Sequence, residues 1–154
     1  MYPVTIRIEP PRRVVGLPHT GPYPQVGPVF QRVAEAIGAA GLWPQAQGGV
    51  MVSYDNPDST PAAELRSFAG VLLPDAAPCP PGLEERRLQG GRHAVLELTG
   101  PYAGLGAAWG WLYGGWMEGA GARPGAAPSY EIYRNDPTDT PPDQLRTDLY
   151  APLA

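Results

Sequence analysis

A four-residue motif, T-G-P-Y, occurs twice in this chain of 154 residues, at residues 20–23 and again at residues 99–102. The similarity continues downstream, where Y-D-N-P at residues 54–57 resembles Y-R-N-D-P at residues 133–137. A repeat of about 75 residues predicts two copies of one structural unit. Two such halves commonly pack about a pseudo-twofold axis, and a cleft at that axis would be a natural ligand site.

A proline-rich segment marks the boundary between the two copies. Residues 74–82 contain four prolines, which interrupt any sheet because proline cannot donate a ladder hydrogen bond. The sequence therefore predicts one domain over residues 1–154, with repeats at 1–74 and 82–154 joined by this linker.

The hydrophobic pattern changes period along each copy. Apolar and polar residues alternate over residues 4–9, which is typical of a half-buried strand, and a helical stripe follows over residues 26–40. The second helix is expected over residues 102–119. At an offset of 79, Ile37 at the end of the first stripe corresponds to Trp116. The predicted fold is α+β: two pseudo-symmetric βαββ units forming an antiparallel sheet with two helices and a central cleft.

Composition excludes several classes of function. The formal net charge is −4 and the chain has no lysine, which argues against a nucleic-acid-binding surface. Cys79 is the only cysteine, so neither a disulfide framework nor a cysteine-based metal site is expected. No apolar run is long enough to cross a membrane, and no cofactor motif is present. We expect a cytoplasmic protein without metal, cofactor, membrane or direct nucleic-acid partner.

Glu131 is the clearest difference between the copies, because at an offset of 79 it falls opposite the apolar Val52. It lies in the expected strand 129–133 and shares a face with Ser129 and Tyr133. One interpretation is a solvated face, or an ion pair with an arginine such as Arg146. The other is a buried acid at a ligand site, with a raised pKa or a cationic guest.

The second helix also carries additional aromatic residues. Trp111 replaces Arg32 of the first copy and lies well away from the core stripe, while Tyr113 lies on its shoulder. Trp109 and Trp116 lie on the stripe, where core packing explains them. Trp111 could cover a cleft, pack under a loop or form an oligomer contact.

Glycines recur every four residues on the same helix, at Gly106, Gly110 and Gly114. Each costs about 1 kcal/mol of helix propensity relative to alanine. The stripe could allow close approach of another backbone or of a flat ligand, or it could reflect glycine-rich codon usage.

The T-G-P-Y motif before a helix and the C-terminal stretch P-S-Y-E-I-Y-R-N-D-P-T-D-T-P resemble the GyrI-like domains. These are also known as the effector-binding domains of multidrug-responsive bacterial transcription activators. The resemblance implies the two βαββ units and the cleft described above. It also implies that Glu131 is an acid in an aromatic-lined cavity that meets cationic, lipophilic drugs. Tyr133 and Tyr150 match aromatic wall positions of this family less specifically.

Three functions follow as hypotheses. The first is a free-standing module that binds small lipophilic, cationic or flat aromatic molecules for drug or toxin sequestration. The second is hydrolysis of cyclopropanoid DNA-alkylating antibiotics, with Glu131 as the catalytic residue. The third is inhibition of DNA gyrase as a protein partner. The expected ligand-binding residues are Glu131, Tyr133, Tyr150, Trp109, Trp111, Tyr113 and Tyr54.

Overall fold

The computed structural model describes residues 2–154 and confirms the α+β fold class. The described chain divides into two compact units. The first unit comprises residues 11–89, and the second comprises residues 2–10 together with residues 90–154. The N-terminal strand therefore groups with the second copy of the repeat rather than with the first.

The first unit contains one helix and a four-stranded antiparallel sheet in the order β3-β4-β2-β5. Val29, Val33 and Ile37 are buried along one face of the helix, as the periodicity predicted. Leu42, Val71 and Leu73 extend the same core. The elements of this unit are β2 (Arg12–Thr20), α1 (Gly27–Ala39), β3 (Gly49–Ser53), β4 (Arg66–Leu72) and β5 (Glu84–Leu88).

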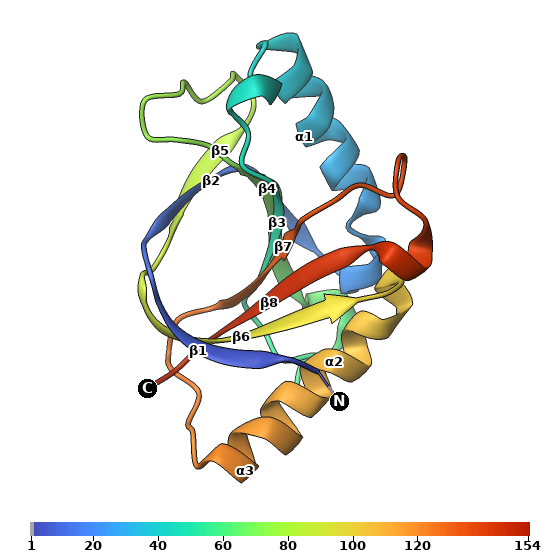
Figure 1. The fold of residues 1–154 in the computed structure, drawn as a ribbon. Helices are drawn as coiled ribbons and strands as arrows, with labels where there is room; N and C mark the ends of the chain where they lie inside the picture. Colours follow the sequence, from blue (N-terminus) through green and yellow to red (C-terminus); the bar gives the residue numbers. More distant parts are fainter. Residues whose placement is uncertain (1) are drawn as a thin grey trace. The chain divides into compact units, whose positions relative to one another are not determined.

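The second unit repeats this plan, with its sheet in the order β1-β6-β8-β7. Its helical segment runs without interruption from α2 through a π-helical turn at Leu112–Trp116 into α3 (Figure 1). The elements of this unit are β1 (Val4–Glu9), β6 (Gly91–Thr99), α2 (Leu105–Trp111), α3 (Met117–Ala120), β7 (Ser129–Tyr133) and β8 (Arg146–Pro152).

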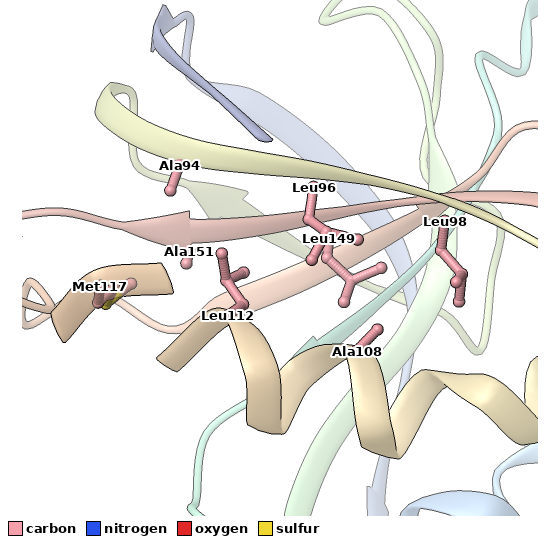
Figure 2. Close-up of a cluster of buried hydrophobic side chains, with 8 residues drawn as sticks. All are labelled: Ala94, Leu96, Leu98, Ala108, Leu112, Met117, Leu149 and Ala151. Atoms are coloured by element: carbon pink, nitrogen blue, oxygen red, sulfur yellow. The ribbon is translucent and has the colours of Figure 1, made fainter. Parts of the chain in front are cut away.

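The hydrophobic core of the second unit lies between its helical segment and one face of its sheet. Ala108 and Leu112 point from the helical segment toward the sheet that carries Leu96 and Leu149, and Met117 belongs to the same buried cluster (Figure 2). All five side chains are almost fully buried. This packing identifies the face of the sheet to which Leu149 belongs as the helix-covered face.

The π-helical turn adds one residue to the second copy. Val29 and Val33 of α1 correspond to Ala108 and Leu112 at an offset of 79, but Ile37 corresponds to Met117 at an offset of 80. A π turn accommodates one extra residue per turn. The prediction that Trp116 takes the place of Ile37 is therefore wrong, and Met117 completes the buried stripe.

The offset of 80 persists through the strands that follow the helix. The amide of Arg66 donates to Asp55 Oδ2 at 2.9 Å, and the amide of Arg146 donates to Asn135 Oδ1 at 2.8 Å. These two contacts are equivalent and are 80 residues apart. The same offset joins β4 (Arg66–Leu72) to β8 (Arg146–Pro152).

Glu131 is consequently the counterpart of Met51, and the prediction that it replaces Val52 is wrong by one residue. Met51 lies opposite Ala69 in the first sheet, and Glu131 lies opposite Leu149 in the second. A one-residue change moves a side chain to the other face of a strand. An acid in the second copy therefore occupies the position of a buried methionine in the first.

The alternation at residues 4–9 correctly predicts strand β1, but only the Val4 end of its apolar face packs against the core. Ile6 and Ile8 are 46% and 78% exposed. The strand lies at the edge of the second unit's sheet and pairs there with β6 alone. The expected burial of these two isoleucines is therefore wrong.

Candidate functional site

Glu131 lies in the middle of β7 and is only 4% exposed. Its partner across the ladder is Leu149, which belongs to the core beneath α2. Glu131 therefore faces the helix-covered side of the sheet, together with Ser129 and Tyr133, because alternate residues of a strand share a face. The prediction that these three residues share one face of the strand is confirmed.

Two neutral donors hold the carboxylate. Trp109 Nε1 donates to Glu131 Oε1 at 2.7 Å, and the Tyr133 hydroxyl donates to Oε2 at 2.7 Å. Among residues 2–154, no arginine pairs with Glu131. The expected partner Arg146 instead bonds Glu97 and Asp148. The interpretation of Glu131 as half of an ion pair with Arg146 is therefore wrong.

Burial determines the electrostatics of this acid. Removal from water raises the pKa of Glu131 above its ordinary value, and the hydrogen bonds from Trp109 and Tyr133 lower it in part. Burial also raises the pKa of Tyr133 well above its ordinary value, and the neighbouring Glu131 charge adds to the rise. The pair can therefore hold a proton, or carry a negative charge that no basic side chain among residues 2–154 neutralises.

Aromatic rings lie beside both donors. The ring of Tyr102 meets that of Tyr133 edge-on, with centroids 5.5 Å apart. The ring of Tyr113 stacks on Trp109, with centroids 5.9 Å apart and planes 20° from parallel. Tyr102 and Tyr113 are each 37% exposed. Aromatic surface therefore runs from the buried acid to the solvent on both sides.

The first copy supplies an internal control for this cluster. Phe30, Met51 and Ser53 occupy the positions of Trp109, Glu131 and Tyr133. Each change from the first copy to the second introduces a group that takes part in the two hydrogen bonds. The acid and its two donors thus distinguish one half of a duplicated fold from the other.

Two of the predicted residues of the second unit lie outside this cluster. Tyr150 is fully buried on the opposite face of the sheet, where it stacks on Tyr130 and accepts a hydrogen bond from Arg134. Its β8 neighbour Leu149 faces the helix, so Tyr150 must face away.

Trp111 does not join the Glu131 cluster either, because it packs against Tyr2 with ring centroids 5.3 Å apart. The contact with Tyr2 agrees with the option that Trp111 packs under a neighbouring segment of the chain. Tyr54 belongs to the first unit, where its hydroxyl accepts a hydrogen bond from Arg86. From the expected set, the cluster in the second unit contains Glu131, Tyr133, Trp109 and Tyr113. Ligand binding by any residue of the expected set stays a prediction.

Sequence reasoning missed Tyr102 and Ser129 as members of the cluster. Tyr102 ends the second T-G-P-Y motif, and its counterpart Tyr23 donates a hydrogen bond to the Asp55 carbonyl at 2.6 Å. The two tyrosines are identical in sequence but have different neighbours, so comparison of the two copies did not single out Tyr102. Burial raises the pKa of Tyr113 and the nearby Ser129 lowers it in part. The position of Ser129 on the Glu131 face of β7 was the available signal.

The chain matches the GyrI-like small molecule binding domain over residues 2–154. It belongs to this family. A DNA gyrase inhibitor from Yersinia enterocolitica is 30% identical over 135 residues, which cover 82% of each protein. Within residues 2–154, no helix is both long enough and apolar enough to span a bilayer.

Solved structures share the fold at low sequence identity. The C-terminal domain of EcmrR is 14% identical with a TM-score of 0.79, and the match covers 100% of this chain and 98% of that one. SAV2435 bound to tetraphenylphosphonium is 15% identical with a TM-score of 0.68, and the match covers 100% and 94% of the two chains. At these identities the similarity supports the fold.

Proposed function

We propose that this GyrI-like domain binds lipophilic cations and flat aromatic molecules at the cluster of Glu131, Trp109, Tyr133, Tyr102 and Tyr113. The observation that carries the proposal is the pair of 2.7 Å hydrogen bonds to Glu131, because both come from neutral donors. A buried carboxylate without a basic partner is energetically costly. A cationic guest would relieve that cost, and the adjoining rings would contact its apolar body.

The chemistry of the cluster matches such a ligand in two further respects. Stacking and cation–π contacts each contribute about 0.5–2 kcal/mol, and this cluster offers four aromatic rings. The partly exposed Tyr102 and Tyr113 give a ligand a first contact at the surface. The tetraphenylphosphonium bound by SAV2435, a protein with the same fold, belongs to this chemical class.

Fluorescence polarisation of rhodamine 6G, a flat cationic dye, tests the proposal. We expect saturable binding by the wild type and weaker binding by Tyr133→Phe, which removes a donor to Glu131. Tyr150→Phe is the matched control, because it removes one tyrosine hydroxyl from the opposite face of the same sheet. Absence of saturable binding by the wild type, or equal loss in both variants, would count against the site.

Hydrolysis by Glu131 is an alternative outcome of the same binding. Chromatography of a cyclopropanoid alkylator recovered from the protein distinguishes the two. Simple binding predicts that the compound returns intact, whereas catalysis predicts a ring-opened product that forms with the wild type and not with Glu131→Gln.

The Yersinia relative motivates a second candidate function, inhibition of DNA gyrase. An acidic domain could occupy a basic surface on that enzyme, because the net charge here is −4. A supercoiling assay with purified gyrase tests this candidate. Loss of supercoiling as the protein is added would support it, and full supercoiling at excess protein would exclude it.

A further inference from the structure

Strand β1 leaves one side of its backbone unpaired in the second unit. Within that sheet it is the outermost strand and pairs with β6 alone, through residues Val4 to Glu9. An outermost strand presents a row of N–H and C=O groups that can template another strand.

The hydrogen-bond pattern identifies which residues present these groups. The Pro3 carbonyl accepts a hydrogen bond from the Glu97 amide at 3.0 Å, so position 3 bonds toward β6. In an antiparallel ladder, bonding toward one neighbour alternates from residue to residue. Thr5 and Arg7 therefore bond toward β6, while the backbones of Val4, Ile6 and Ile8 point outward.

Proline and a β-bulge, two features that usually prevent strand addition, are absent from residues 4–9, although the strand is short and carries the charged Arg7 and Glu9. The chain also has no lysine. Ile6 and Ile8 are 46% and 78% exposed on one face of the strand. Pro3 and Pro10 delimit the segment, so any added strand could pair over only these six residues.

We propose that β1 pairs antiparallel with β1 of a second copy of this chain, about a twofold axis at Ile6. In this register Ile6 lies opposite Ile6 of the second copy, and Val4 lies opposite Ile8. The outward backbone groups of all three residues are then used, in about six hydrogen bonds, two for each directly opposed pair.

Charge and proline disfavour the registers that are shifted toward the C-terminal end of β1. Centring the axis on Arg7 would place two arginines directly opposite each other, and like charges at such positions are destabilising. Centring it on Ile8 would pair Ile6 with Pro10, which has no amide to donate. Centring it on Ile6 places Arg7 opposite Thr5 and creates neither problem.

The expected dimer is weak. A single six-residue strand pair buries less surface than a standard interface of about 1,200–2,000 Å², so the dimer should form only at high protein concentration. This association is independent of the Glu131 cluster and can be tested without any ligand.

Single-cysteine cross-linking tests both the partner and the register. In a Cys79→Ser background, Ile6→Cys places two thiols on opposed residues whose Cα atoms are about 5.5 Å apart, which suits a disulfide. Ile8→Cys shares the exposed face but lies opposite Val4. Trp43→Cys, at a residue that is 49% exposed in the first unit, is the control for random collision.

We expect Ile6→Cys to form disulfide-linked dimers faster than either other variant by about tenfold or more. Equal rates for all three variants would overturn the proposal, as would faster cross-linking of Ile8→Cys. Sedimentation velocity supplies a second measurement, because Ile6→Pro removes an outward amide and should abolish concentration-dependent dimerisation. A wild-type protein that stays monomeric throughout, or that captures only an added extended peptide, would also overturn it.

Discussion

The indole nitrogen of Trp109 donates a 2.7 Å hydrogen bond to the buried carboxylate of Glu131. The contact joins the middle of α2 to the centre of β7. Phe30 and Met51 hold the same two positions in the first copy, where neither side chain can form such a bond. The second copy therefore has a hydrogen-bonded polar pair at two positions that are apolar in the first copy.

Removing the indole donor should destabilise the protein. Trp109→Phe leaves Glu131 Oε1 buried without its partner, and an unsatisfied buried group costs about 1–3 kcal/mol. Urea denaturation should show this loss. In the Glu131→Gln background, Trp109→Phe should reduce the unfolding free energy by less, because it leaves no buried charge without a hydrogen-bond donor. Equal losses in both backgrounds would argue against energetic coupling between the two residues.

The stability contribution of Glu131 should depend on pH. Its pKa is raised in the folded chain, so the folded state holds the proton more tightly than the unfolded state. Stability from this group is therefore complete below the ordinary value of 4.5 and is lost as pH rises through the raised value.

Glu131→Gln should remove this dependence. The unfolding free energy of the variant, relative to the wild type, should increase with pH across that window and be constant below it. Glu118→Gln, at an exposed position on α3, is the control. Parallel pH profiles for wild type and Glu131→Gln would show that burial does not perturb the acid.

Periodicity and the repeat predicted the strands, the helices and the α+β class, because these depend on local patterns that recur in both copies. The alignment of Glu131 could not be predicted correctly. The extra residue is absorbed by a π turn inside an otherwise regular helix, and hydrophobic periodicity does not reveal where such a turn occurs. Because of this one extra residue, the sequence comparison matched Glu131 to Val52. Val52 lies on the opposite face of its strand from Met51, which is the true counterpart.

The placement of aromatic residues was harder to predict for a different reason. Tyr133 and Tyr150 are both tyrosines on adjacent strands, yet they face opposite sides of the sheet. Alternation shows which residues of one strand share a face. The pairing register between two strands must also be known before their faces can be compared. Trp111 likewise depends on Tyr2, which is 109 positions away in the chain, and a helical wheel carries no information about that contact.

The glycines of α2 should be replaceable. A Cβ atom at Gly106 or Gly110 would meet nothing within 4 Å among the described residues. Gly106→Ala should therefore raise the unfolding free energy by about 1 kcal/mol through helix propensity. Thermal denaturation measures this change, and rhodamine binding should be unaffected. A loss of rhodamine binding would instead support a close approach of the ligand to this stripe.

Tyr2 and Trp111 should be energetically coupled. Their rings meet edge-on, and aromatic pairs of this kind contribute about 0.5–1.5 kcal/mol beyond burial of area. A double-mutant cycle with Tyr2→Leu and Trp111→Leu measures that term through urea denaturation. A coupling of zero would mean that the N-terminal segment does not anchor on this helix in solution.

Charge selectivity tests the central claim most directly. Isothermal titration compares tetraphenylphosphonium with the neutral, similarly shaped triphenylphosphine oxide, in the wild type, in Glu131→Gln and in the opposite-face control Tyr150→Phe. If Glu131 recognises cations, the wild type and Tyr150→Phe should prefer the cation by about tenfold or more, and Glu131→Gln should lose this preference. Equal affinities of the wild type for both compounds, or an unchanged preference in Glu131→Gln, would contradict the account.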